Sequence, residues 1–186
     1  MQVSIIDNSG RVSLANEIDK SFQSANQIEI ASAFITSWSI QQLRNHLKNG
    51  RKQICLLIGL FGRFNKQEDL KLLLTLQKEF QGRFQVRIST NNKFHWKYYR
   101  FDGKKGFIVF IGSANFTREG LDKAGELVSK FENRLSRGIV EDASRAFAKQ
   151  WEKSTKIESF PISKYHEVKR SPIANPNNPI DPQLSN

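Results

Sequence analysis

Residues 94–101 have the sequence Phe-His-Trp-Lys-Tyr-Tyr-Arg-Phe, and they are followed by Asp102-Gly103-Lys104-Lys105-Gly106 and by a second apolar stretch, 107–116. Two segments rich in aromatic and β-branched residues, separated by a short polar break that contains glycine, are typical of a β-hairpin. Asp-Gly is a strong turn signal, so we place Asp102 in the turn. The other predicted elements are arranged around this hairpin.

The segments before the hairpin alternate between helical and strand patterns. Apolar spacing predicts helices over 11–26, from Ser39 to Gly50 and from the expected cap Asn65 to Gly82, with strands over 27–35, 53–60 and 84–88. After the hairpin we expect a strand over 126–131 and a helix over 141–153. Strands that alternate with helices imply crossover connections. We therefore predict an α/β fold with a mixed, largely parallel β-sheet flanked by helices on both faces, and we expect His46 to be an exposed surface histidine.

Length and composition predict one domain followed by a tail. The chain has 186 residues, and all five prolines lie in the polar segment that begins near Phe160. We place the domain over 1–158 and a Pro/Asn-rich tail or linker over 159–186. The N-terminus has no signal-peptide pattern, and no apolar run approaches the ~20 residues of a membrane span, so we expect a cytoplasmic protein without a membrane partner.

The positive charge of the chain favours a polyanionic partner. Lysine and arginine number 29 against 18 acidic residues, which gives a formal charge of +11. Between Arg83 and Arg118 the only acidic residue is Asp102. A basic run taken alone is usually a solvated face, but nucleic acid is the first partner to consider. The residues that we expect to contact it are Arg100, Lys104, Lys105 and Arg118.

Two short motifs at the hairpin carry the candidate chemistry. Side chains alternate along a strand, so His95 and Lys97 share one face. Taken alone, this pair is more often part of a half-exposed strand. The return strand is apolar and ends abruptly at Gly112-Ser113-Ala114-Asn115. Strand ends at the rim of an α/β sheet are where ligands bind, so the two motifs together make a candidate site.

The combination of His95-x-Lys97 and Gly112-Ser113-x-Asn115 resembles the signature of the phospholipase D superfamily. It is most similar to the nuclease branch, which includes metal-independent restriction endonucleases and domains attached to DNA helicases. The resemblance covers about 27–151 and implies a phospholipase D-like fold in which His95, Lys97, Ser113 and Asn115 form a phosphodiesterase site. It also implies a homodimer, because members with one motif per chain work in pairs.

Two further residues are weaker candidates by the same resemblance. Asp102 has the family's spacing from Lys97, but nine residues separate it from Gly112 where the family has six, and its strand parity is opposite to that of His95. Glu126 stands where restriction-type relatives carry a glutamate, and it could orient His95.

The chemistry of such a site needs neither a cofactor nor a metal. A neutral imidazole can attack phosphorus and form a phosphohistidine, while Lys97, Ser113 and Asn115 stabilise charge on the nonbridging oxygens. The motif has no nearby acidic cluster for Mg²⁺ and no Cys/His set for zinc. By resemblance, His95 of a second subunit supplies the proton for the leaving oxygen.

The predicted function is therefore that of a homodimeric, metal-independent endodeoxyribonuclease of restriction type. Two alternatives stay open, namely a phospholipid phosphodiesterase of the same superfamily and a non-catalytic DNA-binding subunit. The segment 171–186 has the composition of a linker, so a DNA-recognition domain beyond it, or a helicase partner, is a further expectation.

Overall fold

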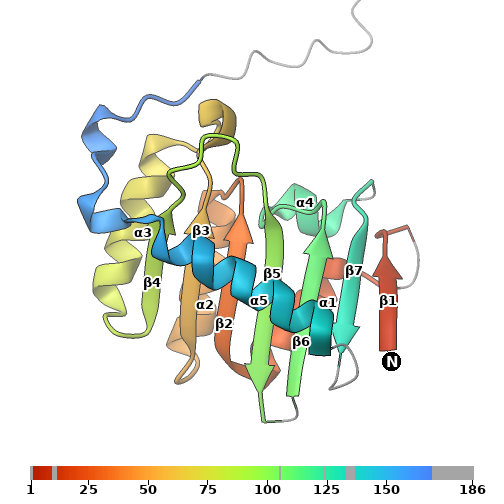
Figure 1. Ribbon diagram of the computed structural model, residues 1–186. Helices are drawn as coiled ribbons and strands as arrows, with labels where there is room; N and C mark the ends of the chain where they lie inside the picture. Colours follow the sequence, from red (N-terminus) through yellow and green to blue (C-terminus); the bar gives the residue numbers. More distant parts are fainter. Residues whose placement is uncertain (1, 10–11, 105, 124, 133–136, 169–186) are drawn as a thin grey trace, which may run out of the picture.

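The computed structural model describes residues 2–9, 12–104, 106–123, 125–132 and 137–168, and an eight-stranded sheet runs through the whole molecule (Figure 1). Across the sheet the strands follow the order β1-β7-β6-β5-β2-β3-β4-β8. The strands are β1 (Gln2–Ile6), β2 (Ala25–Ser32), β3 (Gln53–Ile58), β4 (Phe84–Ile88), β5 (Lys97–Gly103), β6 (Gly106–Gly112), β7 (Val128–Glu132) and β8 (Thr155–Lys156). The helices are α1 (Leu14–Ser24), α2 (Ser37–Lys48), α3 (Gln67–Glu79), α4 (Arg118–Asp122) and α5 (Arg137–Glu152), with short 3-10 turns η1 (Phe61–Arg63), η3 (Ile157–Ser159) and η4 (Ile162–Lys164).

The sheet is mixed, as predicted, but it is not largely parallel. Strands β2, β3 and β4 are parallel neighbours linked through α2 and α3. The other pairings between named strands, β1–β7, β2–β5, β4–β8, β5–β6 and β6–β7, are all antiparallel. The expected parallel majority is wrong because β5, β6 and β7 follow one another as antiparallel neighbours, and β5 also runs antiparallel to β2. The edge strands β1 and β8 were not predicted.

Helices cover both faces of the sheet. On one face, α1, α2 and α3 pack over the strands and enclose the larger core, while α5 crosses the other face (Figure 1). The alternation of β5 divides its side chains between the two cores, because Tyr99 and Phe101 join the larger one and Tyr98 joins the one beneath α5. This predicted parity fixes which face of the sheet each motif residue can reach.

Four local expectations are wrong in detail. Helix α2 begins after Thr36, whose N–H donates to the Ser39 hydroxyl (3.2 Å), so Ser39 lies inside the first turn. Asp102 is not in the turn, because it lies within β5 opposite Phe107 while Gly103 pairs with Gly106. Nor is His46 exposed: its ring is stacked on Phe22, with centroids 4.1 Å apart. The fourth concerns Asn65.

Asn65 does not cap α3, which begins after Lys66. Its side chain is buried, donates to the carbonyls of Gly59 (2.7 Å) and Ala33 (2.9 Å), and accepts from the N–H of Ile35 (2.9 Å). One amide therefore ties together the segments that leave β2 and β3. Both segments lie at the edge of the sheet where β5 begins.

The described chain continues to pack on the domain beyond residue 158. Ile162 and Tyr165 are buried and belong to the larger core, and the Tyr165 hydroxyl donates to the Asn65 carbonyl (2.9 Å). The predicted tail therefore begins with ten residues, 159–168, that contact the domain, whereas 169–186 lie outside the described residues. In the described part of the chain, no helix has the length and apolar character to cross a membrane.

We predict that Asn65→Ala lowers the free energy of unfolding by about 3 kcal/mol or more, because it leaves three buried backbone groups without partners at roughly 1–3 kcal/mol each. Urea unfolding followed by circular dichroism measures the change. The matched control is Asn16→Ala on the exposed surface of α1, which we expect to stay within about 0.5 kcal/mol of wild type. Equal stability of the two variants would contradict the proposed role of the Asn65 amide.

Candidate active site

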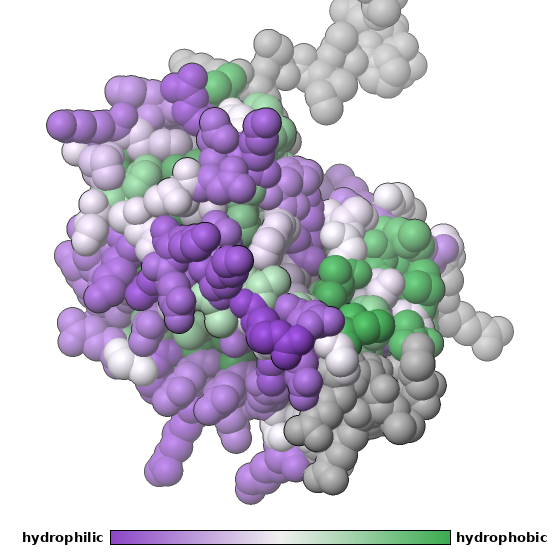
Figure 2. Space-filling view, in the orientation of Figure 1, coloured by the Kyte–Doolittle hydropathy of each residue, from purple (hydrophilic) through white to green (hydrophobic). Residues whose placement is uncertain are grey.

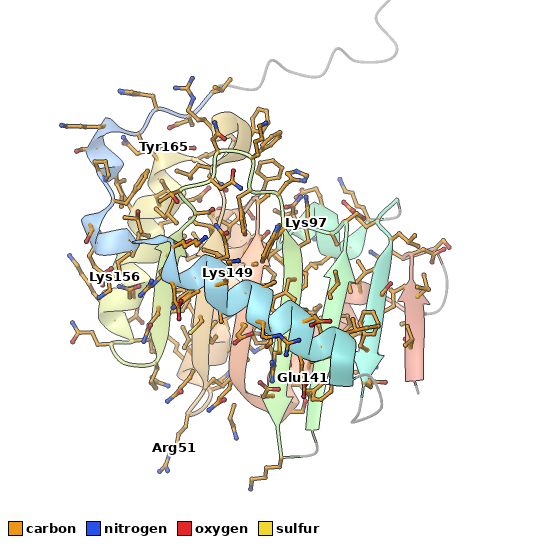
Figure 3. The ribbon with its side chains drawn as sticks, viewed as in Figure 1. Arg51, Lys97, Glu141, Lys149, Lys156 and Tyr165 are labelled. Atoms are coloured by element: carbon orange, nitrogen blue, oxygen red, sulfur yellow. The ribbon has the colours of Figure 1, made fainter. Side chains whose placement is uncertain are left out.

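The two motifs meet at one edge of the sheet. Parallel strands β2 and β3 end there, whereas the antiparallel strand β5 begins there with Lys97, and β6 ends there at Gly112. Figure 3 shows Lys97 at this edge. His95 lies just before β5 and Ser113 just after β6. The pairing of β5 with β6 therefore brings together residues that are 18 positions apart in the sequence, as the hairpin predicted.

Lys97 is buried and lies in contact with His95. Its Nζ lies 2.5 Å from Nδ1 and 3.1 Å from Nε2 of the imidazole, and it donates to the His95 carbonyl (3.0 Å). The imidazole itself is exposed, with the rings of Phe34 and Phe61 packed edge-on against it at centroid distances of 5.6 and 5.1 Å. An accessible imidazole is thus held between apolar rings and beside an ammonium group.

This environment favours the neutral form of the imidazole. Burial against its neighbours, and then the charge of Lys97, lower the pKa of His95 below its ordinary value of 6.5. Burial also lowers the pKa of Lys97, while the carboxylate of Glu126 acts in the opposite direction. A neutral imidazole keeps a lone pair, which nucleophilic attack requires.

Backbone contacts hold the Gly112-Ser113-Ala114-Asn115 segment in place. The buried Tyr99 hydroxyl donates to the Ala114 carbonyl (2.7 Å), and Ser113 accepts from the N–H of Leu127 (2.9 Å). A Cβ on Gly112 would lie 2.2 Å from the Leu127 carbonyl oxygen, so only glycine fits this close approach to β7. The first residue of the motif is therefore explained by packing.

The side chain of Asn115 lies at a cleft beside the site. Its Oδ1 accepts from the N–H of Phe34 (3.2 Å), and its amide NH₂ has no partner among the described residues. Asn115 and Glu126 both line a cleft of about 890 Å³, together with Phe34, Phe64 and Lys66. The amide nitrogen can thus donate to an anion in the cleft.

The two weaker candidates differ in their placement. Glu126 lies at the cleft and interacts electrostatically with Lys97, but within the described structure no hydrogen bond joins it to His95. Asp102 lies at the far end of β5, accepts from Arg100 Nε (2.8 Å), and has the opposite parity to Lys97. The structure thus places Glu126 at the site and Asp102 away from it. The described residues contain no group of three or more His, Cys, Asp or Glu side chains arranged to hold a metal ion.

The basic residues predicted to contact nucleic acid do not form one surface. Arg100 is half-buried and donates to Asp102 and to the Ser144 hydroxyl on α5. Lys104 lies at the tip of the hairpin, about 20 Å from the site at a rise of roughly 3.3 Å per residue. Lys105 falls outside the described residues. Arg118 begins α4 with its side chain 70% exposed, on the segment that directly follows the Gly-Ser-x-Asn motif.

Sequence reasoning missed the aromatic wall beside His95. Phe61 and Phe64 belong to the loop after β3, and Phe34 follows β2. The ring of Phe34 contacts both Phe64 and His95, at centroid distances of 5.6 Å in each case. The available signal was the sequence Leu-Phe-Gly-Arg-Phe over 60–64, where large apolar residues continue past a buried strand into a loop. Large apolar side chains in a loop usually pack against another part of the protein, and here Phe61 packs against His95.

Comparison with solved structures defines the fold class. The chain is similar to Nuc from Salmonella typhimurium, a phospholipase D family member, with TM-score 0.62, 18% identity, and 83% of this chain and 95% of that chain covered. It is also similar to NucT from Helicobacter pylori, with TM-score 0.62, 17% identity, and coverages of 83% and 98%. The fold is therefore phospholipase D-like.

The family follows from the sequence. The model of the NgoFVII restriction endonuclease N-terminal PLD domain matches residues 12–152, and the chain belongs to that family. The match includes both motifs of the site. No curated protein compared with this chain matches it.

We predict that His95 titrates below 6.5 and that Lys97→Met raises its pKa, because the substitution removes a positive charge that disfavours the imidazolium. NMR titration of the three histidines measures both values, with signals assigned through His46→Gln and His166→Gln. Lys104→Met, which removes a distant charge, should leave the His95 titration unchanged. A fall in the His95 pKa on Lys97→Met would contradict the described contact.

Proposed function

We propose that this domain hydrolyses DNA phosphodiester bonds without a metal ion, through a covalent intermediate on His95. The observation that carries the proposal is the contact between the exposed imidazole of His95, whose pKa is lowered, and the buried ammonium of Lys97; both side chains line a hollow of about 320 Å³ beneath α5. Membership of the restriction endonuclease PLD-domain family supports DNA as the substrate. The net charge of +11 is complementary to a nucleic acid backbone.

The reaction consists of two displacements at phosphorus. In the first, a ring nitrogen of His95 attacks, a nitrogen–phosphorus bond forms, and the bond from phosphorus to one sugar oxygen breaks. Lys97 and the Asn115 amide donate to the nonbridging oxygens, where negative charge increases in the transition state. In the second, water attacks phosphorus and the bond to His95 breaks, which releases the phosphorylated strand.

The first displacement also requires a proton for the leaving sugar oxygen. Each chain has one His95, and His46 lies on α2 against Phe22. His166 precedes Glu167 and Val168, which line the cleft, but among the described residues no hydrogen bond or ring contact joins His166 to His95. We therefore propose a homodimer in which His95 of the partner subunit is the general acid. In that arrangement one imidazole is nucleophile and the other is protonated.

An exposed apolar surface beside the motif suits such a dimer. On the face that carries α5, Figure 2 shows apolar side chains gathered on the β6–β7 side. Leu127, which is 60% exposed, is hydrogen-bonded through its N–H to Ser113, and Ile139 on α5 is 50% exposed. Burial of this surface by a second copy would bring the two sites close together.

We expect purified protein to cleave DNA in the presence of EDTA, and His95→Ala to lose at least roughly 10³-fold in rate because the nucleophile is removed. Gel analysis of a labelled oligonucleotide measures cleavage, and His166→Ala is the matched control with activity near wild type. Circular dichroism checks that His95→Ala stays folded. Strong activity in that variant would reject the nucleophile, and cleavage of phosphatidyl substrates in place of DNA would favour a phospholipid phosphodiesterase.

DNA binding by wild-type protein with no cleavage, and no effect of His95→Ala, would favour a non-catalytic DNA-binding subunit. Mass spectrometry after alkaline quenching should detect the phosphoryl-linked strand on the peptide that contains His95, because phosphohistidine is stable in base and labile in acid. Absence of the adduct under single-turnover conditions would count against the covalent route.

Mixed dimers test whether two His95 residues share one reaction. Wild-type and His95→Ala chains are denatured together in equal amounts and refolded. About half of the dimers then contain one His95, and about one quarter contain two. A shared site predicts about one quarter of wild-type activity. Activity of about one half of that of the same amount of wild-type protein would show that each chain acts alone. Sedimentation of the same samples checks that the chains have formed dimers.

A further inference from the structure

The hollow that contains the proposed nucleophile lies beneath α5. Its lining includes His95 and Lys97 from the sheet edge, and Ala143 and Ala146 from α5. The alanines have short side chains, so they leave space between the helix and the imidazole. A phosphate in contact with His95 would therefore lie close to α5, and the groups joined to that phosphate would pass over the helix.

Beyond the hollow, the surface of α5 is basic. Lys149 and Lys153 lie three and seven residues after Ala146, on the same face of the helix, and both are exposed. Figure 3 shows Lys149 on the upper half of α5, the half nearer the sheet edge that carries Lys97. Over 143–156 the sequence has four basic residues and one acidic residue, Glu152. The positive charge thus begins where the hollow ends.

Hydrogen bonds join the loop before the nucleophile to the same half of α5. The Gln150 amide donates to the Ser89 hydroxyl (2.9 Å), and the Arg87 guanidinium donates to the Trp151 carbonyl (2.8 Å). The loop carries Lys93, which is exposed and lies two residues before the nucleophile. The loop and the helix therefore form one continuous surface.

Three exposed lysines of this surface, Lys93, Lys149 and Lys153, are called the basic strip below. No ion pair joins any of them to a carboxylate within the part of the chain that the structure describes. Figure 2 shows hydrophilic side chains over the β3–β4 half of this face, apart from the apolar side chains on the β6–β7 side. The charges of the strip are thus available to a partner.

The cleft beside Asn115 has the opposite charge balance. It lies against α3 and α4, across the sheet edge from α5. Its charged lining consists of four carboxylates and two ammonium groups, from Asp69, Glu119, Glu126, Glu167, Lys66 and Lys123. An excess of carboxylates repels a polyanion. Charge therefore favours the α5 side over the cleft for a long chain of phosphates.

We propose that the basic strip binds the phosphate backbone of double-stranded DNA whose scissile phosphate lies at His95, so that the duplex passes over α5 and not through the cleft. From Ala146 to Lys153 the helix rises about 10 Å, which equals about three base pairs of B-DNA at roughly 3.4 Å each. The strip can thus contact phosphates a few base pairs from the cleaved bond. The inference rests on the proposed function, and it leaves the apolar surface on the β6–β7 side to the second copy.

The test measures binding and cleavage of a fluorescent duplex of mixed sequence in EDTA, by wild type and by Lys149→Gln/Lys153→Gln. Binding is followed by anisotropy in the His95→Ala background, so that the DNA stays intact. We expect the double variant to bind at least about 10-fold more weakly near 0.1 M salt, and to lower the slope of log Kd against log salt by about 0.9 for each lysine that contacts a phosphate. In cleavage, KM should rise while kcat stays near wild type, because neither lysine contacts the reacting phosphate.

The matched control is Lys71→Gln/Lys78→Gln, which makes the same change in net charge at exposed positions on α3. It should leave both affinity and salt slope near wild type. Equal losses by the two double variants would show that net charge alone matters and would overturn the strip. A larger loss from Lys66→Gln/Lys123→Gln would place the DNA in the cleft and overturn it as well.

The failures of the two proposals are distinguishable in the same samples. If wild type binds the duplex but does not cleave it, the proposed function fails, whereas weaker binding by Lys149→Gln/Lys153→Gln still supports the binding surface. If wild type cleaves and this double variant binds and cleaves equally well, the inference alone is rejected.

Discussion

The hydrogen bond from the Tyr99 hydroxyl to the Ala114 carbonyl (2.7 Å) is the contact on which the site depends. Tyr99 is two residues beyond Lys97 on the same face of β5, and Ala114 is the centre of the Gly-Ser-x-Asn segment. The bond is buried, so its loss would leave a carbonyl without a partner. It fixes the two motifs against each other in a way that the pairing of β5 with β6, which ends at Tyr98 and Ile111, does not.

Similar buried bonds extend this arrangement to the neighbouring loops. The Ser32 hydroxyl donates to the Phe34 carbonyl (2.6 Å) and accepts from the N–H of Phe116 (2.9 Å), while Asn65 joins Ala33 to Gly59. Each segment at this edge of the sheet is therefore tied to the next by a polar side chain. A rigid edge of this kind holds the imidazole and the aromatic rings in fixed positions, which catalysis by preorganised groups requires.

The electrostatics of the site follow from the same packing. Lys97 is buried because β5 lies between β2 and β6, and its amino group lies in contact with the imidazole of His95, although burial lowers the pKa of Lys97. Burial and then the charge of Lys97 lower the pKa of His95, and Glu126 partly offsets the cost of burying Lys97. The position of Lys97 at the start of β5 thus affects both the pKa of His95 and the charge at the site.

The sequence by itself determined the hairpin, its parity and the pairing of the two motifs, because strand alternation and the ends of apolar runs are local properties. It also determined the class of fold, through the alternation of helices and strands. Only the tertiary structure decided that β5 is antiparallel to β2, that Asp102 and Arg100 face α5, and that Asn65 ties loops together instead of capping a helix. It alone placed Phe34 and Phe61 against His95. These contacts join segments distant in the chain, and no periodicity within a segment specifies which other segment will meet it.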